Sequence, residues 1–378
     1  MSAISACAGT REASTSAQTR DSAGVAIADG PLTDVPLPWT LTELRRIGGA
    51  DSGAGAFNRV APSSVATDGR TRIAVLDTDN ENRVHVFDSS GAVIRTMGGR
   101  GAGPGETTYP DGLRFEDDGS LAVFDYAKMA LVRFDSGGAP QRERSVASGR
   151  GQLSGAPRVT GDVMWVLLDR MDSVSQIRRL ERWSPQDTLV IDSTVEVKPK
   201  MHRFTCIGLA LSPLFSPEIE WSTIGARDVA VTTQSTYVVN IYRDGRLIRS
   251  VRRPVVPTAT RPEDAARLYP DGLKVGFDGG ECVTPSAEIA EKVGMAPTLP
   301  VVRSSLMAPD GSLWVARYTL KGETPSVDVF SPAGQYEGTL RGRGLPLGFL
   351  GNDIVLFAIT NADDDTSVVG LFRIARPR

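Results

Sequence analysis

The sequence predicts an all-β protein, a six-bladed β-propeller closed by an N-terminal strand. The first observation is a repeated unit, best seen at 64–98, in which short apolar runs alternate with turn formers such as Asp-Gly and Asp-Ser-Ser-Gly. The second is an isolated strand-like segment, 39–49, which resembles the last strand of that unit. The third is the end of the chain, which stops one strand short of a full unit. Four-stranded units cannot bury both faces alone, so they are expected to pack as a ring.

Composition narrows the classes of partner. The chain has 378 residues, 40% of them hydrophobic, and a formal net charge of -3. Nucleic-acid binding depends on clustered Lys and Arg, so no nucleic-acid partner is expected. No apolar run approaches the roughly 18–20 residues of a membrane-spanning helix. We expect a monomeric folded body.

Residues 1–37 are predicted to be a lipobox remnant and a disordered tether. Residues 4–7 read Ile-Ser-Ala-Cys, the pattern at which bacterial lipoproteins are cut and lipidated, here at Cys7. Residues 1–3 are too few for a secretory signal, so either the match is chance or the true start lies upstream. We favour the second interpretation, which predicts a periplasmic cell-envelope protein that touches the membrane only through its lipid. The Ser-, Thr- and Ala-rich stretch that follows is typical of a flexible tether.

The repeat accounts for residues 38–378. Turn chemistry and apolar runs place the six blades at 64–98, 111–143, 164–191, 228–253, 302–340 and 349–375. The third is degenerate, and the inner strand of the fourth is unclear. Segment 39–49 is expected to pair with 368–375 and so close the ring.

Two segments carry a family resemblance. Residues 75–91, VLDTDNENRVHVFDSSG, resemble an NHL-type repeat with extra residues in the turn before Asn82. Residues 39–378 resemble bacterial six-bladed β-propeller lipoproteins, notably in GGRGAGPGE at 98–106 and PDGSLWVARY at 309–318. The resemblance implies the fold but no single activity, because propellers host binding, lyase and hydrolase functions.

Two insertions, 192–223 and 254–301, each leave an outer strand and enter the next inner strand. Both therefore belong on one face of the propeller and are expected to form a partial lid. The second contains helix signals, with capping-box spacing at 260–263 and a Pro285-led segment that stops at Gly294. Each insertion holds one cysteine, so we expect a Cys206–Cys282 disulfide in an oxidising compartment. The alternative is two separate buried thiols in a cytosolic protein.

The same face receives polar residues that follow the second strands of several blades. The candidate rim of a ligand site consists of Asp77, Asp125, Tyr126, Asp169, Arg317 and Tyr318. A mixture of carboxylate, guanidinium and phenol groups suits a polar or anionic ligand. For the aspartates we favour the alternative that each caps its own turn. For Arg317 and Tyr318 both interpretations stay open.

Several other sites are disfavoured. The glycines at 98–105 lack the Lys and the following helix of a phosphate loop. The only histidines are His85 and His202, so the multi-histidine metal centre of some NHL-type lyases is not expected. The acidic segment 361–365 leaves Ca²⁺ open, but a solvated turn is favoured. No cofactor is therefore predicted.

Two functions remain. The first is non-catalytic binding of a small molecule or an envelope protein on the lidded face. The alternative is a metal-dependent, carboxylate-liganded hydrolase or lyase of the lactonase type. Catalysis is left open, with binding favoured. Asp and Asn side chains that converge from at least three blades would indicate the enzyme, whereas a channel mouth of Arg, Tyr and apolar residues would indicate binding.

Overall fold

The computed structural model describes residues 18–377, with gaps at 50–52, 54, 80, 147–150, 172–175, 205, 278–279 and 362–365. The predictions for Cys7 and for most of the acidic segment 361–365 lie outside the described residues.

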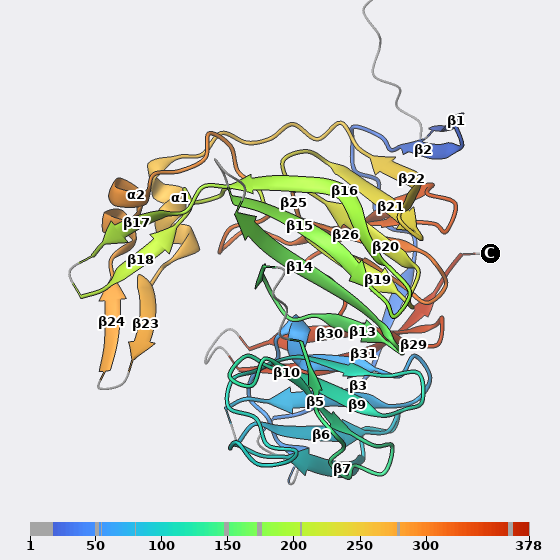
Figure 1. Ribbon diagram of the computed structural model, residues 1–378. Coiled ribbons are helices and arrows are strands. Elements are labelled where there is room, and N and C mark those ends of the chain that lie inside the picture. The colour runs from blue at the N-terminus through green and yellow to red at the C-terminus, as the bar shows by residue number, and fades with distance from the viewer. Residues whose placement is uncertain are drawn as a thin grey trace, which may run out of the picture.

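Six antiparallel sheets form the blades of a propeller (Figure 1). Blade 1 contains β4 (Val65–Thr67), β5 (Ile73–Asp77), β6 (Arg83–Phe87) and β7 (Val93–Gly98). Blade 2 contains β8 (Pro110–Phe115), β9 (Leu121–Asp125), β10 (Ala130–Phe134) and β11 (Arg144–Ser145). Blade 3 contains β12 (Gln152–Leu153), β13 (Arg158–Thr160), β14 (Val163–Met171), β15 (Gln176–Trp183) and β16 (Thr188–Val197).

The remaining blades continue the same order. Blade 4 contains β19 (Glu220–Ile224), β20 (Asp228–Thr232), β21 (Val238–Arg243) and β22 (Arg246–Arg252). Blade 5 contains β25 (Val302–Met307), β26 (Leu313–Arg317), β27 (Ser326–Phe330) and β28 (Tyr336–Arg341). Blade 6 contains β29 (Gly348–Leu350), β30 (Ile354–Thr360), β31 (Ser367–Ala375) and, from the N-terminal part of the chain, β3 (Thr40–Ile47).

The N-terminal strand closes the ring. β3 pairs antiparallel with β31, from Thr40 opposite Ala375 to Ile47 opposite Val369. The predicted closure is therefore confirmed. It joins chain ends that would otherwise leave blade 6 with an open outer edge, and such edges are prone to pair with other chains.

The core lies between successive blades. Every residue of the second strands β5 and β9 is buried. One hydrophobic cluster fills each of the six junctions between neighbouring blades, such as the Trp314 cluster between blades 5 and 6. Full burial of a large apolar side chain stabilises by about 1.5–3 kcal/mol, so the radial packing that the repeat predicts supplies the main stabilisation.

Residues 18–36 differ from the predicted tether. β1 (Gln18–Ser22) and β2 (Val25–Asp29) form a hairpin, and β2 pairs parallel with β22 on the outer edge of blade 4. Pro36 then bridges Thr339 of blade 5 before β3 joins blade 6. This N-terminal belt, residues 18–47, gains its order from backbone pairing at blade edges, and such pairing needs no apolar pattern in the added strand.

The two insertions form one arm that stands out from the propeller (Figure 1). Because β16 continues to Val197 and β19 begins at Glu220, the first insertion is 198–219 and thus shorter than the predicted 192–223. The arm contains β17 (Lys200–Arg203), β18 (Gly208–Leu211), α1 (Pro262–Leu268), β23 (Leu273–Phe277), β24 (Gly280–Thr284) and α2 (Ser286–Val293). Both predicted helices are present.

The arm has its own small core and its own covalent link. Phe204, Phe215 and Ile289 pack in a cluster that also takes Leu320 from blade 5. The predicted disulfide joins Cys206 to Cys282, with the two Cα atoms 5.9 Å apart. The bond ties the two insertions together across blade 4 and limits the freedom of the unfolded chain.

Candidate functional site

The inner strands surround the central channel that a propeller ring creates. Each runs from the arm side to the far side, and the strand registers give the depth of its side chains. Glu220 pairs with Thr232, the last residue of β20, so Glu220 stands at the arm-side mouth. Arg303 follows Val302, which pairs with the last residue of β26, so Arg303 stands at the same level. Arg158 of β13 and Arg114 of β8 pair nearer the far ends of their neighbouring strands and lie deeper.

These four residues, Arg114, Arg158, Glu220 and Arg303, are called the channel cluster below. Their charges interact, but they are not directly paired. Among the described residues, no ion pair or side-chain hydrogen bond reaches Glu220, Arg158 or the guanidinium of Arg303. Arg158 instead lies over the ring of Trp221, with its Cζ atom 4.9 Å from the ring centroid.

The electrostatics of Glu220 show how enclosed the mouth is. Burial raises the pKa of Glu220 to about 7, and the nearby Glu218 carboxylate adds to the rise. Arg158, Arg303 and Arg178 act in the opposite direction but do not overcome it. With this pKa, the Glu220 carboxylate is partly protonated and partly ionised near neutral pH.

The two deeper arginines are also desolvated. Burial lowers the pKa of Arg158, with Glu220 opposing, although the side chain stays accessible to solvent. Both observations agree if the guanidinium faces an interior channel with protein on every side. Burial, and then the neighbouring Arg158, lower the pKa of Arg114 to about 9. Arg114 donates one hydrogen bond, to Thr160 Oγ1 at 3.5 Å, and its Nε atom has no partner.

Two buried hydroxyls near the channel also lack partners. Ser222 of β19 is 1% exposed and Ser305 of β25 is 4% exposed, and neither Oγ atom makes a hydrogen bond. Ile224 lies on the same face of β19 as Ser222, and Met307 lies on the same face of β25 as Ser305. Both apolar residues pack in the core between blades 4 and 5. The hydroxyls therefore face the same junction, below Glu220, where an unsatisfied polar group carries a free-energy cost.

Of the six predicted ligand-site residues, the three aspartates already have hydrogen-bond partners within the protein. Asp125 accepts hydrogen bonds from the backbone N–H groups of Thr108, Tyr109 and Ala127. Asp77 accepts one from the N–H of Asp79. Asp169 forms a bidentate pair with Arg178, at 2.7 and 3.0 Å. Turn capping therefore accounts for Asp77 and Asp125, whereas Asp169 orients an arginine that also reaches Glu218 at 3.2 Å.

The two tyrosine candidates remain at the mouth. Tyr126 is 38% exposed and packs edge-on against Phe124. Tyr318 packs edge-on against Phe215 of the arm. Burial raises the pKa of Tyr318, and the nearby Arg303 opposes the rise, which places this phenol beside the channel cluster. Whether either tyrosine binds a ligand stays a prediction.

Arg317 belongs to another place. It contacts Asp34 of the belt and Asp328 of β27, at the outer junction of blades 4 and 5. Arg253 contacts the same two carboxylates, and Arg341 also reaches Asp34 at 2.7 Å. We call this set the rim cluster, which is distinct from the predicted ligand site; it consists of Asp34, Arg253, Arg317, Asp328 and Arg341. Burial acts to raise the pKa of Asp34, but hydrogen bonds and charge from Arg317 and Arg253 outweigh it and lower the pKa to about 2.

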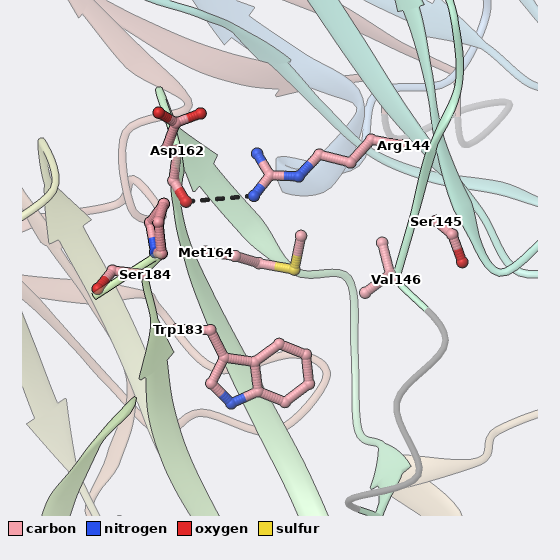
Figure 2. A pocket seen from close by; sticks show the side chains of 8 residues that line it. Arg144, Ser145, Val146, Asp162, Met164, Trp183 and Ser184 are labelled. Carbon is pink, nitrogen blue, oxygen red and sulfur yellow. Dashed lines mark hydrogen bonds between the residues drawn. The ribbon is translucent and has the colours of Figure 1, made fainter. Parts of the chain in front are cut away.

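A separate pocket lies between blades 2 and 3 (Figure 2). Its volume is about 350 Å³, and Val146, Met164 and Trp183 form part of its wall. Arg144 crosses it and donates hydrogen bonds to the carbonyl oxygens of Gly161 and Asp162, at 3.1 and 3.2 Å. The guanidinium thus joins the two blades.

No motif in the sequence marks the channel cluster. Its members lie in short inner strands of blades 2 to 5. The repeat pattern of blade 3 is degenerate, and the inner strand of blade 4 is unclear in the sequence. The usable signal was a charged residue within an otherwise strand-like segment, as in Glu-Ile-Glu-Trp at 218–221. Such a residue in an inner strand can only face the channel or a neighbouring blade.

The described residues contain neither a cluster of metal-ligating side chains nor a membrane-spanning helix. No group of three or more His, Cys, Asp and Glu side chains comes together in the described part of the chain. His85 lies on the third strand of blade 1 and shares a hydrogen bond with Thr96, 2.9 Å away. Within the described ranges, no helix is long and apolar enough to span a bilayer.

Comparison with known proteins supports the architecture. Residues 61–149 match a family described as "6-bladed beta-propeller". A protein from Bacteroides fragilis described as exported is 12% identical, with a TM-score of 0.54 over 91% of this chain and 97% of that one. A member of the DUF4221 family from Bacteroides vulgatus is 9% identical, with a TM-score of 0.58 over 91% and 100%. No curated protein matches the sequence. The resemblance to bacterial six-bladed β-propellers is thus confirmed, and at these identities it concerns the fold alone.

Proposed function

We propose that this six-bladed β-propeller is a non-catalytic binding protein of the bacterial cell envelope that takes an anionic ligand, or an anionic group of a partner, at the arm-side mouth of its channel. The carrying observation is the set of arginines at 114, 158 and 303, which come from blades 2, 3 and 5 and, among the described residues, have no ion-paired carboxylate. Enclosed cations usually have a partner. An external oxyanion would supply it.

The surroundings suit a ligand of this kind. Arg178 is already held by Asp169 and Glu218, so it leaves Arg158 and Arg303 as the accessible cations. Tyr318 beside Arg303 and Tyr269 of the arm near Glu218 offer aromatic faces and hydroxyls at the mouth. In the described residues, no carboxylate cluster favours the metal-dependent alternative.

The proposal also includes the cellular location, the bacterial cell envelope. The Bacteroides fragilis neighbour is described as exported. A disulfide between two irregular insertions suits an oxidising compartment. Lipid attachment at Cys7 remains part of this proposal.

Sulfate binding at constant ionic strength tests the function. We expect sulfate to raise the melting temperature and to change Trp fluorescence, because Arg158 lies over Trp221. Arg158→Gln and Arg303→Gln should each weaken binding about tenfold, since a hydrogen bond to a charged group contributes about 1.5–3 kcal/mol.

The matched control is Arg246→Gln, which removes an exposed arginine in the outer hairpin of blade 4. It experiences the same general salt effects but should bind sulfate like the unaltered protein. If all three variants respond alike, the channel arginines do not form an anion site.

A further inference from the structure

We infer that Glu220 is an internal competitor for the channel arginines, so that its protonation strengthens anion binding at the mouth and its ionisation weakens it. The inference rests on the proposed anion site and adds a proton-dependent control of that site.

Glu220 lies near both of the arginines that are proposed to bind the anion. Glu220 is the first residue of β19, at the mouth, and it lies between blade 3, which supplies Arg158, and blade 5, which supplies Arg303. Both guanidinium groups act on its carboxylate electrostatically. Neither forms a direct ion pair with it among the described residues. Glu220 therefore neutralises part of their charge without satisfying their hydrogen-bonding capacity.

Among the described residues, four charged side chains act on Glu220 most strongly. From its own approach segment comes Glu218, from β15 comes Arg178, and from β13 and β25 come the two channel arginines. Arg178 is occupied by Asp169 and Glu218. From the described part of the arm, the phenol of Tyr269 lies near Glu218. Glu220 is thus surrounded by two accessible arginines, Arg303 at its own level and Arg158 deeper, and is repelled by Glu218.

Proton binding to Glu220 and anion binding to the two arginines are thermodynamically linked. An anion that binds the two arginines repels an ionised Glu220, so anion binding and proton binding favour each other, and by thermodynamic reciprocity each shifts the other by the same factor. The raised pKa of Glu220, about 7 from burial and Glu218, puts this exchange near neutral pH. An ordinary glutamate would stay ionised throughout that range.

The test is sulfate affinity as a function of pH, because sulfate keeps its charge between pH 6 and pH 8.5. For the unaltered protein we expect affinity to fall about tenfold across this range, a typical coupling between sites. Glu220→Gln should bind as tightly as the unaltered protein at pH 6 and should show no such fall. Sulfate binding at pH 7 should also take up protons, measured by calorimetry in buffers of different ionisation enthalpy, and this uptake should vanish in Glu220→Gln.

The matched control is Glu291→Gln, an exposed position on α2 of the arm, which should behave like the unaltered protein. Sulfate binding with the same pH dependence in Glu220→Gln would overturn the competitor role and leave the anion site intact. Failure of sulfate to bind either protein at any pH would instead overturn the proposed function.

Discussion

The rim cluster and the channel cluster use the same chemistry to opposite effect. In each, arginines from different blades surround carboxylates in a desolvated position. At the rim, Asp34 and Asp328 accept direct hydrogen bonds from Arg253 and Arg317, and the pKa of Asp34 falls to about 2. In the channel, Glu220 has no direct partner among the described residues, and its pKa rises to about 7.

The comparison shows that direct contact with arginines, more than their number, decides whether the net pKa shift of a buried carboxylate is upward or downward. Desolvation raises the pKa in both places, and only hydrogen-bonded pairs overcome it. A fully paired cluster joins parts of the fold, whereas a cluster with unpaired members has capacity left for a ligand. Four substitutions and a change of pH test this difference between the two clusters.

The largest effect is expected at the buried centre of the rim cluster. Asp328→Asn removes the charge that faces Arg253 and Arg317, and the side chains of Asp328 and Arg253 are both 0% exposed. Loss of one partner from a buried ion pair costs about 3–5 kcal/mol. Urea denaturation should show this loss, while Asp353→Asn in the exposed turn before β30 should change stability little. Equal stabilities would mean that the rim cluster does not hold blades 4 and 5 together.

A smaller loss is expected where the belt joins the rim. Asp34→Asn should cost about 2 kcal/mol at pH 7, from a pKa of 3.8 in the unfolded chain and about 2 in the fold. This carboxylate has a lowered pKa, so its contribution is complete above pH 4 and falls as pH approaches 2. The gap between Asp34→Asn and the unaltered protein should therefore narrow on acidification from pH 5 to pH 3. A constant gap would contradict the charge-based account.

The smallest effect has the opposite sign. Glu220→Gln should stabilise the protein by about 1–2 kcal/mol above pH 7, after allowance for partial solvent screening. The fold raises this pKa from 4.5 to about 7, so the unaltered protein loses stability as pH rises between those values. The advantage of Glu220→Gln should be absent at pH 4.5 and complete above pH 7. Thermal melts across that range would refute the contrast if Glu220→Gln were destabilising at every pH.

Much of the fold followed from local patterns. The turn sequences and apolar runs predicted the blades, the unmatched segment 39–49 predicted the closing strand, and two lone cysteines in neighbouring insertions predicted the disulfide. The part of the belt that precedes the closing strand, residues 18–36, was missed because strand addition at a blade edge uses backbone groups, and its side chains carry no apolar alternation. Arg317 was assigned to the ligand face because a strand end gives its level but not the direction of its side chain.

Local sequence patterns were enough to predict the number of blades, the way the ring closes and the common face of the two insertions, because turn chemistry and strand alternation act over a few residues. Which charges are satisfied depends on the folded ring. Asp34 and Arg317 meet across 283 positions of sequence, and Arg158 and Arg303 reach the channel from different blades. Whether two charged groups hydrogen-bond depends on ångström-scale distances between strands brought together only by the ring, and no local pattern encodes those distances.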